Sequence, residues 1–221
     1  MSKRALVVLA AVCATFSLLS IFLIDRTLAE AVHRSGLENA GIVVTVRSGL
    51  DFFTGRGLVG ANVSFGQFLL GLVFIAIGVV WLIVRRTSQA ARGLIFAGAV
   101  QLVTMEIGWL LKDYFGRLRP NQLLQSGDWN HWWFSGGNSF PSGHNDFFWG
   151  LCLPLAYVFP RWRIPILIVP VFIAFARIDE NYHFLGDVLA SIALAALITL
   201  LAAVLAARWV QPQAAASRSG K

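Results

Sequence analysis

His183 and Asp187 have the spacing that could support nucleophilic chemistry. The two residues are four positions apart, so on a helix the carboxylate can hold one imidazole nitrogen and leave the other nitrogen free. An imidazole held in this way can act as a nucleophile or as a base. Taken alone, the pair is explained about as well by a polar cap on the helix that follows.

The tetrapeptide Pro-Ser-Gly-His at 141–144 could bind a phosphate. Gly143 permits close approach of the backbone, and Ser142 adds a hydroxyl donor. The apolar run that follows predicts a helix start, whose N–H groups and positive dipole end attract anions. An ordinary turn with a helix cap is the alternative, and the tetrapeptide alone would favour that alternative.

Lys112, Arg119 and Arg177 could supply positive charge for such an anion. Lys112 and Arg119 are seven residues apart, or two helical turns, so we expect both on one face of a helix that Pro120 ends. Two cations on one face suit an anion with several oxygens. A basic anchor at the end of a membrane helix is the alternative interpretation.

The composition around these residues is that of a membrane protein. Of 221 residues, 57% are hydrophobic and 13% are charged, and the mean hydropathy is +0.69. These values exclude a water-soluble globular domain as the leading interpretation. The net charge of +7 is better explained by membrane topology than by a nucleic-acid partner, so no nucleic acid is expected. Cys13 and Cys152 lie in apolar runs and support neither a disulfide framework nor a thiolate metal site.

We predict an all-α fold, a polytopic membrane bundle of six transmembrane helices that forms one domain over residues 1–221. The expected spans are 5–24, 64–84, 93–111, 147–160, 164–176 and 188–207. The fourth and fifth runs are about 20 Å long against a hydrocarbon core of ~30 Å, so they must borrow length from flanking polar residues. The charge-balanced segment at about 25–56 follows no transmembrane pattern and is expected along the outer interface as helix and loop.

The distribution of Lys and Arg predicts the orientation of the bundle. Six spans place ten of the 18 basic residues on the side of both termini and eight on the other side. The larger set lies in very short loops and tails, where the positive-inside bias is counted, so we expect cytoplasmic termini in a bacterial inner membrane. The three polar clusters then fall together on the outer, periplasmic face. That conjunction favours a functional site over three unrelated structural features.

In this order the clusters resemble the signature of the type-2 phosphatidic acid phosphatase superfamily. The signature reads Lys, six residues, Arg-Pro; then Pro-Ser-Gly-His; then Ser-Arg, five residues, His, three residues, Asp. The matching residues are Lys112 to Pro120, 141 to 144, and Arg177 to Asp187. The resemblance covers residues 112–187 and departs at Ala176, where the family has Ser. The first 111 residues match only in the number of spans.

The resemblance implies a phosphohistidine mechanism that needs no metal or other cofactor. His183 would attack the phosphorus, and Asp187 would fix its tautomer. His144 would protonate the leaving group and later accept a proton from water. The expected phosphate-binding residues are Lys112, Arg119, Ser142, Gly143 and Arg177. The remaining histidines, His33 and His131, lack partners at metal-ligand spacing.

The implied function is a membrane-embedded phosphatase that hydrolyses a lipid phosphate monoester or diphosphate, with that lipid and the surrounding membrane lipids as its partners. Phosphatidic acid, phosphatidylglycerol phosphate, isoprenyl diphosphate and the phosphates of lipid A offer the same reacting group, so the substrate stays open, as does the oligomeric state. Vanadate-dependent haloperoxidases share the signature but resemble soluble proteins. A non-enzymatic anion-binding transporter or channel is the alternative from another class. It explains the cations but not His144 or the spacing of His183 and Asp187.

Two further features stand outside the signature. Glu106 lies within the third span, six residues before Lys112, and is expected to have a structural partner in the bundle. The stretch 121–140 contains Trp129, Trp132 and Trp133, and a loop of this length beside a candidate site is usually functional. Anchoring at the membrane interface is one interpretation of these rings, and contact with the lipid substrate is the other.

Overall fold

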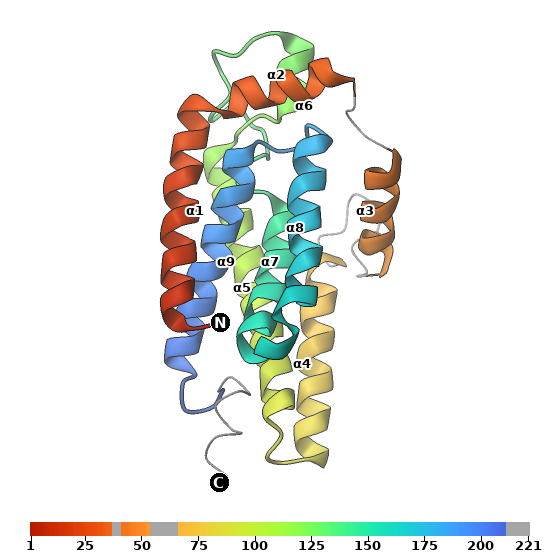
Figure 1. Ribbon diagram of the computed structural model, residues 1–221, viewed down its shortest axis with the longest axis vertical. Helices are drawn as coiled ribbons and strands as arrows, with labels where there is room; N and C mark the ends of the chain where they lie inside the picture. The colour runs from red at the N-terminus through yellow and green to blue at the C-terminus, as the bar shows by residue number, and fades with distance from the viewer. Residues whose placement is uncertain (37–40, 54–65, 211–221) are drawn as a thin grey trace.

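The regular structure of the chain is helical, as the sequence predicts. The structure, a computed structural model, describes residues 1–36, 41–53 and 66–210, and within these ranges it contains helices and connecting turns but no strand (Figure 1). In chain order the helices are α1 (Lys3–Leu23), α2 (Asp25–Ser35), α3 (Gly41–Phe53), α4 (Gly66–Val84), α5 (Gln89–Phe115), α6 (Pro120–Ser126), α7 (Gly143–Val158), the short 3-10 helix η1 (Pro160–Trp162), α8 (Arg163–Asp179) and α9 (Leu185–Leu205).

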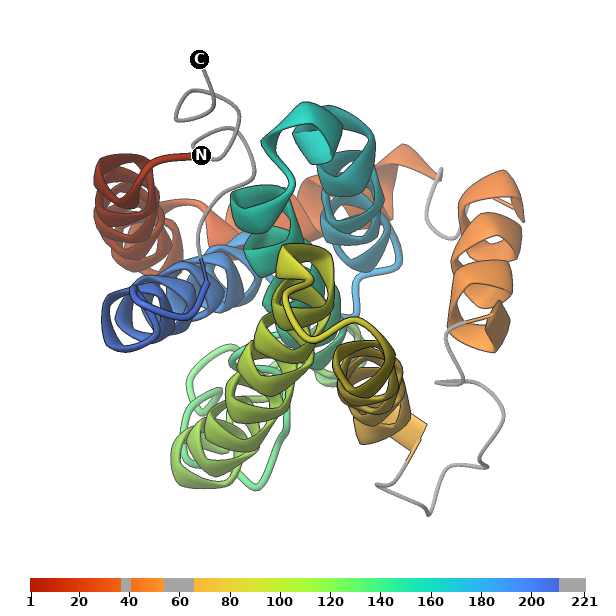
Figure 2. The same cartoon turned by 90° about the horizontal axis from the view of Figure 1, so that it is seen from below.

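The α7 helix lies at the centre of the bundle. It packs against α5, α8 and α9, while α1 lies along α9 and α4 lies along α5 (Figure 1 and Figure 2). Nearly all of α7 is buried, including Phe147, Leu153 and Val158. A helix that is apolar on every side needs neighbours all round it, so α7 takes the central position.

Glycines allow α4 and α5 to approach each other closely. A Cβ atom at Gly98 would lie 2.4 Å from the carbonyl oxygen of Gly71, and a Cβ atom at Gly71 would lie 2.2 Å from Oε1 of Gln101. Small residues at such contacts let helix backbones meet where lipid weakens the hydrophobic drive for association. The contact also brings Gln67, at the start of α4, to the same cavity as Lys112 near the end of α5.

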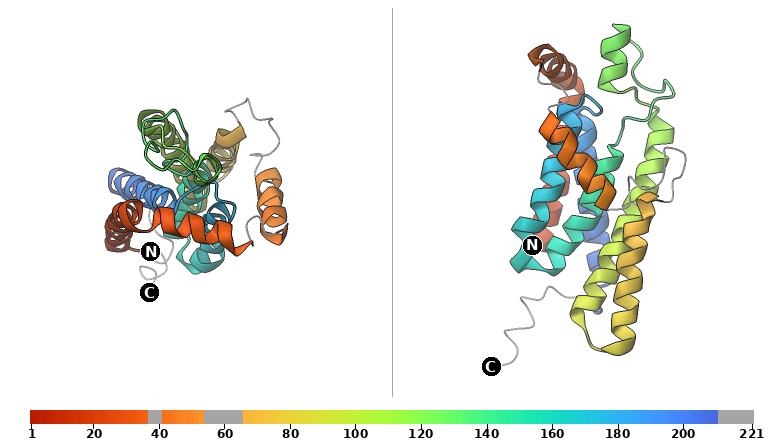
Figure 3. Two further views of the ribbon diagram at one scale, coloured as in Figure 1. Left: turned by 90° about the horizontal axis from the view of Figure 1, so that it is seen from above. Right: turned by 90° about the vertical axis from the view of Figure 1, so that its right-hand side faces the viewer.

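The segment between α1 and α4 lies at the end and at the side of the bundle. The α2 helix crosses one end next to α6, and α3 stands beside α8, apart from the central helices (Figure 1 and Figure 3). Of the expected interfacial segment at 25–56, residues 37–40 and 54–56 lie outside the described residues. The position of this segment at the membrane surface stays a prediction.

Four stretches of the described chain are long and apolar enough to cross a membrane. They are α1, α4, the stretch Gln89–Ser126 that contains α5, and α9. The α7 and α8 helices have 16 and 17 residues, which gives each a length of roughly 24–26 Å. Spans at α7 and α8 therefore stay predictions. Arg56, Arg218 and Lys221, which contribute to the charge count, lie outside the described residues.

Candidate active site

The three polar clusters meet toward one end of the bundle. The α5 and α8 helices end there, and α7 and α9 begin there, so residues that are far apart in the sequence come together (Figure 1). A cavity of about 580 Å³ lies between these helix ends. Its lining includes Lys112, Arg119, Gly143, His144, Arg177 and His183. Two other expected site residues, Ser142 and Asp187, are fully buried.

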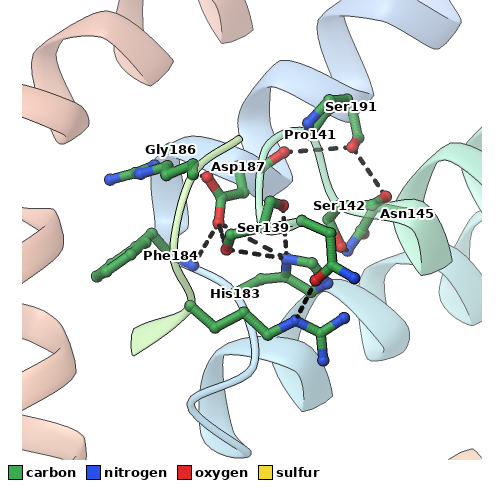
Figure 4. Close-up of polar contacts among 12 residues, drawn as sticks. Ser139, Pro141, Ser142, Asn145, His183, Phe184, Gly186, Asp187 and Ser191 are labelled. Carbon is green, nitrogen blue, oxygen red and sulfur yellow. Dashed lines mark hydrogen bonds and ion pairs between the residues drawn. The ribbon is translucent and has the colours of Figure 1, made fainter. Parts of the chain in front are cut away.

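His183 has a tautomer that its surroundings determine. Its Nδ1 lies 2.9 Å from the carbonyl oxygen of Ser139 and 3.6 Å from Oδ2 of Asp187 (Figure 4). Because a carbonyl oxygen only accepts hydrogen bonds, Nδ1 carries the proton and Nε2 has the lone pair needed for attack. The predicted contact with Asp187 is present, but the shorter bond goes to Ser139, which the sequence reasoning missed.

Burial keeps the His183 imidazole neutral. The residue is 3% exposed, and the loss of hydration lowers the pKa of His183 to about 3. The neighbouring carboxylate of Asp187 opposes this change in pKa, while the positive charges of Lys112 and Arg177 add to it. A neutral imidazole with an unprotonated Nε2 is the form that can attack an electrophile.

Asp187 lies in the first turn of α9, where three donors hold its carboxylate. Oδ2 accepts hydrogen bonds from Oγ of Ser139 at 2.6 Å and from the N–H of Phe184 at 2.9 Å, and Oδ1 accepts one from Arg117 at 2.5 Å. His183 itself precedes α9, so the two residues do not share a helix. Asp187 therefore acts both as a helix cap and as the partner of the histidine, which are the two interpretations that the spacing left open.

Arg117 is a buried residue beside the candidate site that the sequence reasoning missed. Its side chain is fully buried, and its guanidinium bridges Asp187 at 2.5 Å and Asp25 at 2.7 Å. Asp25, at the start of α2, also accepts hydrogen bonds from Oγ of Ser20 at 2.6 Å and from the N–H of Gly186 at 2.9 Å. The corner between α1 and α2 is thereby joined to the carboxylate that contacts His183. In the sequence, Arg117 stands only as one more basic residue among others.

The three tryptophans singled out in the sequence lie near arginine side chains. Two of them cover Arg117, and the third lies over Arg26. The guanidinium carbon of Arg117 lies 4.8 Å from the ring centre of Trp132 and 4.5 Å from that of Trp133. Trp129 lies 5.0 Å from the guanidinium carbon of Arg26. In the described part of the chain, none of these rings lines the cavity. Their contact with a lipid substrate stays a prediction.

Lys112 and Arg119 reach the cavity by a different route from the one expected. The α5 helix ends just before Gly116, which takes a left-handed conformation with a φ of 50°, and Arg119 lies in extended backbone before α6. The prediction that the two cations share one helix face was therefore wrong. They meet at Asn138 instead, because Nζ of Lys112 donates to its carbonyl oxygen at 2.9 Å and Nε of Arg119 donates to its Oδ1 at 2.9 Å.

Arg177 is positioned by a carboxylate and an aromatic ring. It donates a hydrogen bond to Oε2 of Glu180 at 2.5 Å, and its guanidinium carbon lies 4.4 Å from the ring centre of Tyr182. The same ring lies 5.2 Å from the guanidinium carbon of Arg119. Tyr182 lines the cavity and contacts both arginines, so it helps to set their relative positions.

His144 is held from α3, a helix that lies outside the signature. Nε2 of His144 lies 3.2 Å from Oδ2 of Asp51, and the same oxygen accepts a hydrogen bond from Arg47 at 2.7 Å. Arg47 also donates to Oε1 of Glu180 at 2.6 Å. The sequence reasoning missed Asp51 and Arg47, because no fixed spacing relates α3 to the signature.

Ser142 and Gly143 form the start of α7. Gly143 lines the cavity, while Oγ of Ser142 accepts a hydrogen bond from Nδ2 of Asn145 at 3.0 Å. Phosphate binding by Ser142 stays a prediction, as does the effect of Ala176, which is fully buried.

The described residues do not supply the expected partner of Glu106, and they do not test metal independence. The Glu106 side chain is exposed, and among the described residues it makes no hydrogen bond or ion pair, so the expected structural partner is not found there. Within residues 1–36, 41–53 and 66–210, no three His, Cys, Asp or Glu side chains are grouped so that they could hold a metal ion. Metal independence stays a prediction for the assays below.

Comparison with known proteins identifies a family and two relatives. The family model of the PAP2 superfamily matches residues 90–211. A lipid A 1-phosphatase from Rhizobium johnstonii is 33% identical over 102 residues, which make up 45% of this chain and 42% of that protein. A lipid A 1-phosphatase from Rhizobium etli is 32% identical over 102 residues, which make up 45% of this chain and 44% of that protein. The chain thus matches less than half the length of these relatives, and no solved structure gives a significant match.

Proposed function

The chain belongs to the PAP2 superfamily, and from this membership and the geometry of the cavity we propose that it is a membrane-embedded phosphatase that acts on a lipid phosphate. The state of His183 carries the proposal. It is a buried neutral imidazole whose Nδ1 proton is donated to the carbonyl oxygen of Ser139, and it shares its cavity with four cationic side chains, Arg47, Lys112, Arg119 and Arg177. This arrangement suits attack on a phosphorus atom whose oxygens are neutralised by neighbouring cations.

In the proposed first step, Nε2 of His183 attacks the phosphorus in line with the leaving oxygen. The N–P bond forms while the P–O bond breaks, and protonated His144 gives its proton to the departing oxygen. Nδ1 of His183 keeps its proton, which it donates to the carbonyl oxygen of Ser139, and Asp187 stabilises the positive charge that develops on the ring. The cations that face the phosphate oxygens are Lys112, Arg119 and Arg177.

In the proposed second step, water hydrolyses the phosphohistidine. The oxygen of the water molecule bonds to phosphorus while neutral His144 takes a proton from that water, and the N–P bond breaks. His183 returns to its neutral form, His144 is again protonated, and inorganic phosphate leaves. The cycle therefore closes without a metal ion or another cofactor.

Lipid A is the substrate that we propose to test first. Both relatives are named lipid A 1-phosphatases. Phosphatidic acid, phosphatidylglycerol phosphate and isoprenyl diphosphate present the same reacting group and are the alternatives.

We propose that the cavity faces the periplasm and that both termini are cytoplasmic. The positive-inside bias supports cytoplasmic termini, and the arrangement of the bundle, in which α1 begins and α9 ends away from α2 and α6, supports a cavity on the opposite side of the membrane (Figure 1). A cysteine introduced at Gln125, in a background without Cys13 and Cys152, should react with an impermeant thiol reagent in intact cells. Protection of this cysteine until the inner membrane is opened would reverse the orientation.

The experiment that tests the chemistry is phosphate release by purified protein from a panel of these four lipids, in the presence of a chelator. Acid-quenched protein should carry labelled phosphate after incubation with a phosphate-labelled substrate. His183→Ala should neither release phosphate nor carry the label, because the covalent route needs the nucleophile. His131→Ala, in an exposed position outside the cavity, is the matched control and should behave as the wild type.

The outcomes separate the proposal from its main alternative. A non-enzymatic anion-binding transporter or channel would bind phosphate but would release none from any lipid. Wild-type protein that turns over but never carries the label would overturn the phosphohistidine step, and activity that disappears with the chelator would overturn metal independence.

A further inference from the structure

The environment of His144 assigns a role to a helix that the family signature does not include. His144 lines the cavity together with His183, and Oδ2 of Asp51 on α3 lies 3.2 Å from its Nε2. Asp51 is 8% exposed, and the His144 side chain is 18% exposed, so the contact is largely shielded from water. A carboxylate in this position interacts more strongly with a protonated imidazole than with a neutral one.

We infer that Asp51 is the positioning residue of His144, which it holds in place and in the protonated form that donates to the leaving group. This inference rests on the proposed function and deepens it, because it names the group that makes His144 an acid. As the P–O bond breaks, the departing oxygen takes the proton of His144 and leaves a neutral imidazole. Asp51 itself neither gains nor loses a proton in this step.

Arg47 provides the second part of the argument. It donates a hydrogen bond to the same Oδ2 of Asp51 at 2.7 Å, so the carboxylate that faces the imidazole is itself held in place from α3. The negative charge of an aspartate can stabilise an imidazolium, whereas the neutral amide of an asparagine could not. The pair lies on one face of α3, four residues apart.

Arg47 also connects α3 to Arg177 of α8 through Glu180. Its Nε donates to Oε1 of Glu180 at 2.6 Å, and Oε2 of Glu180 accepts from Arg177 at 2.5 Å. Arg177 is one of the cations expected to bind the phosphate. The α3 helix therefore positions the proton donor through Asp51 and supports a phosphate-binding arginine through Arg47 and Glu180.

The test measures how Asp51→Asn affects the hydrolysis of substrates with different leaving groups. This substitution keeps the shape of the side chain and removes its charge. The substrates are lipid A and phosphatidic acid, whose leaving oxygens need a proton, and 4-nitrophenyl phosphate, whose nitrophenolate leaves without one. The measured quantity is kcat/KM, because it includes only the steps up to departure of the leaving group. Each value is divided by that of the wild type on the same substrate, so differences in substrate access cancel.

We expect kcat/KM to fall on the order of 10 to 100-fold for the lipid substrates and by less than about threefold for the aryl ester, since general acid catalysis assists mainly the poor leaving group. Asp51→Asn should cause no further loss on the lipids in a His144→Ala background, because the two residues act as one unit. Thr45→Ala, an exposed polar residue on the same helix, is the matched control and should retain wild-type ratios.

The other possible results overturn either the role of Asp51 alone or the proposed function as well. Equal losses on the lipids and on the aryl ester would show that Asp51 only supports the fold of α3, and a full additional loss in the His144→Ala background would show the same. Either result would overturn the inference and leave the phosphatase proposal intact. Wild-type protein that releases phosphate from no substrate would overturn the proposed function and the inference together.

Discussion

The two histidines of the cavity are held in opposite ways. His183 is bound to the interior of the bundle, where a backbone carbonyl and a fully buried network around Asp187 and Arg117 determine its tautomer. His144, in the first turn of α7, contacts Asp51 of α3, the helix that lies beside the bundle (Figure 1). Its side chain is 18% exposed. We refer to these regions as the interior side and the α3 side of the cavity.

This difference matches the chemistry proposed for each residue. A nucleophile gains from being neutral and correctly aligned before the substrate arrives, and burial in a rigid network provides both conditions. An acid that becomes a base within the same cycle must change its charge and exchange protons near water. A partly exposed imidazole beside a carboxylate can do so, whereas the environment of His183 opposes protonation. The comparison leads to four predictions, in order of decreasing effect.

The interior side should be the more important one for stability. Arg117→Met would leave Asp25 and Asp187 facing each other without their shared cation, which should lower the free energy of unfolding by about 3–5 kcal/mol. Adding Asp25→Asn removes one of the two charges and should recover much of that loss, while kcat stays low because Asp187 has still lost its donor. Thermal unfolding in detergent and lipid phosphatase assays measure the two effects.

Arg26→Met provides the control for this pair, since Arg26 is an exposed arginine that also lies against a tryptophan. It should change stability little. A double variant no more stable than Arg117→Met alone would show that the network is held by packing and not by charge.

The α3 side should be the more important one for phosphate binding, because Arg47 of α3 holds Glu180, and Glu180 in turn holds Arg177. Arg177→Lys keeps the charge but loses the planar guanidinium that contacts Glu180 and Tyr182, so turnover should fall on the order of 100-fold with little change in stability. Arg34→Lys, an exposed arginine on α2, serves as the control. If Arg177→Lys were close to the wild type in kcat, the arginine would supply only a general positive field.

The pH dependence of stability should separate the two histidines. Burial lowers the pKa of His183 from 6.5 to about 3, so between these values the unfolded chain binds a proton that the folded chain does not. Stability therefore falls as the pH falls from 6.5 toward 3, and at pH 5 the cost of keeping His183 neutral should be about 2 kcal/mol. His183→Gln should lose that much less stability than the wild type between pH 7 and pH 5.

His131→Gln, in an exposed loop, should follow the wild-type curve in the same titration. Parallel curves for the wild type and His183→Gln would mean that the folded protein can protonate His183, and the interior side would then not hold a neutral nucleophile.

The smallest effect is expected for the aromatic rings. Trp133→Ala removes a ring that covers Arg117, so it should lower kcat/KM about fivefold on a lipid phosphate and on a soluble phosphate ester alike. Contact with the lipid substrate, one of the two interpretations that the sequence left open, would lower only the value for the lipid. A loss confined to the lipid would thus move Trp133 from the interior side to the path of the substrate.

The signature residues could be predicted because their spacing is visible along the chain. Lys112, Arg119, His144, Arg177 and His183 line one cavity, as the conjunction of three clusters on one side of the bundle indicated. One local inference was wrong, since Lys112 and Arg119 do not share a helix face. The left-handed Gly116 ends α5 between them, and their convergence comes from the fold of the following loop around Asn138.

By itself, the sequence determined the class of the fold, the family and six of the residues that line the cavity. Apolar runs, charge and fixed spacing are local properties, and they are sufficient for those conclusions. Only the tertiary structure decided how the two histidines are held. The Ser139 carbonyl, the Arg117–Asp25 pair and the Asp51–His144 contact each join segments far apart in the chain. No periodicity relates such segments, because the packing of whole helices sets which backbone oxygen or carboxylate lies beside an imidazole.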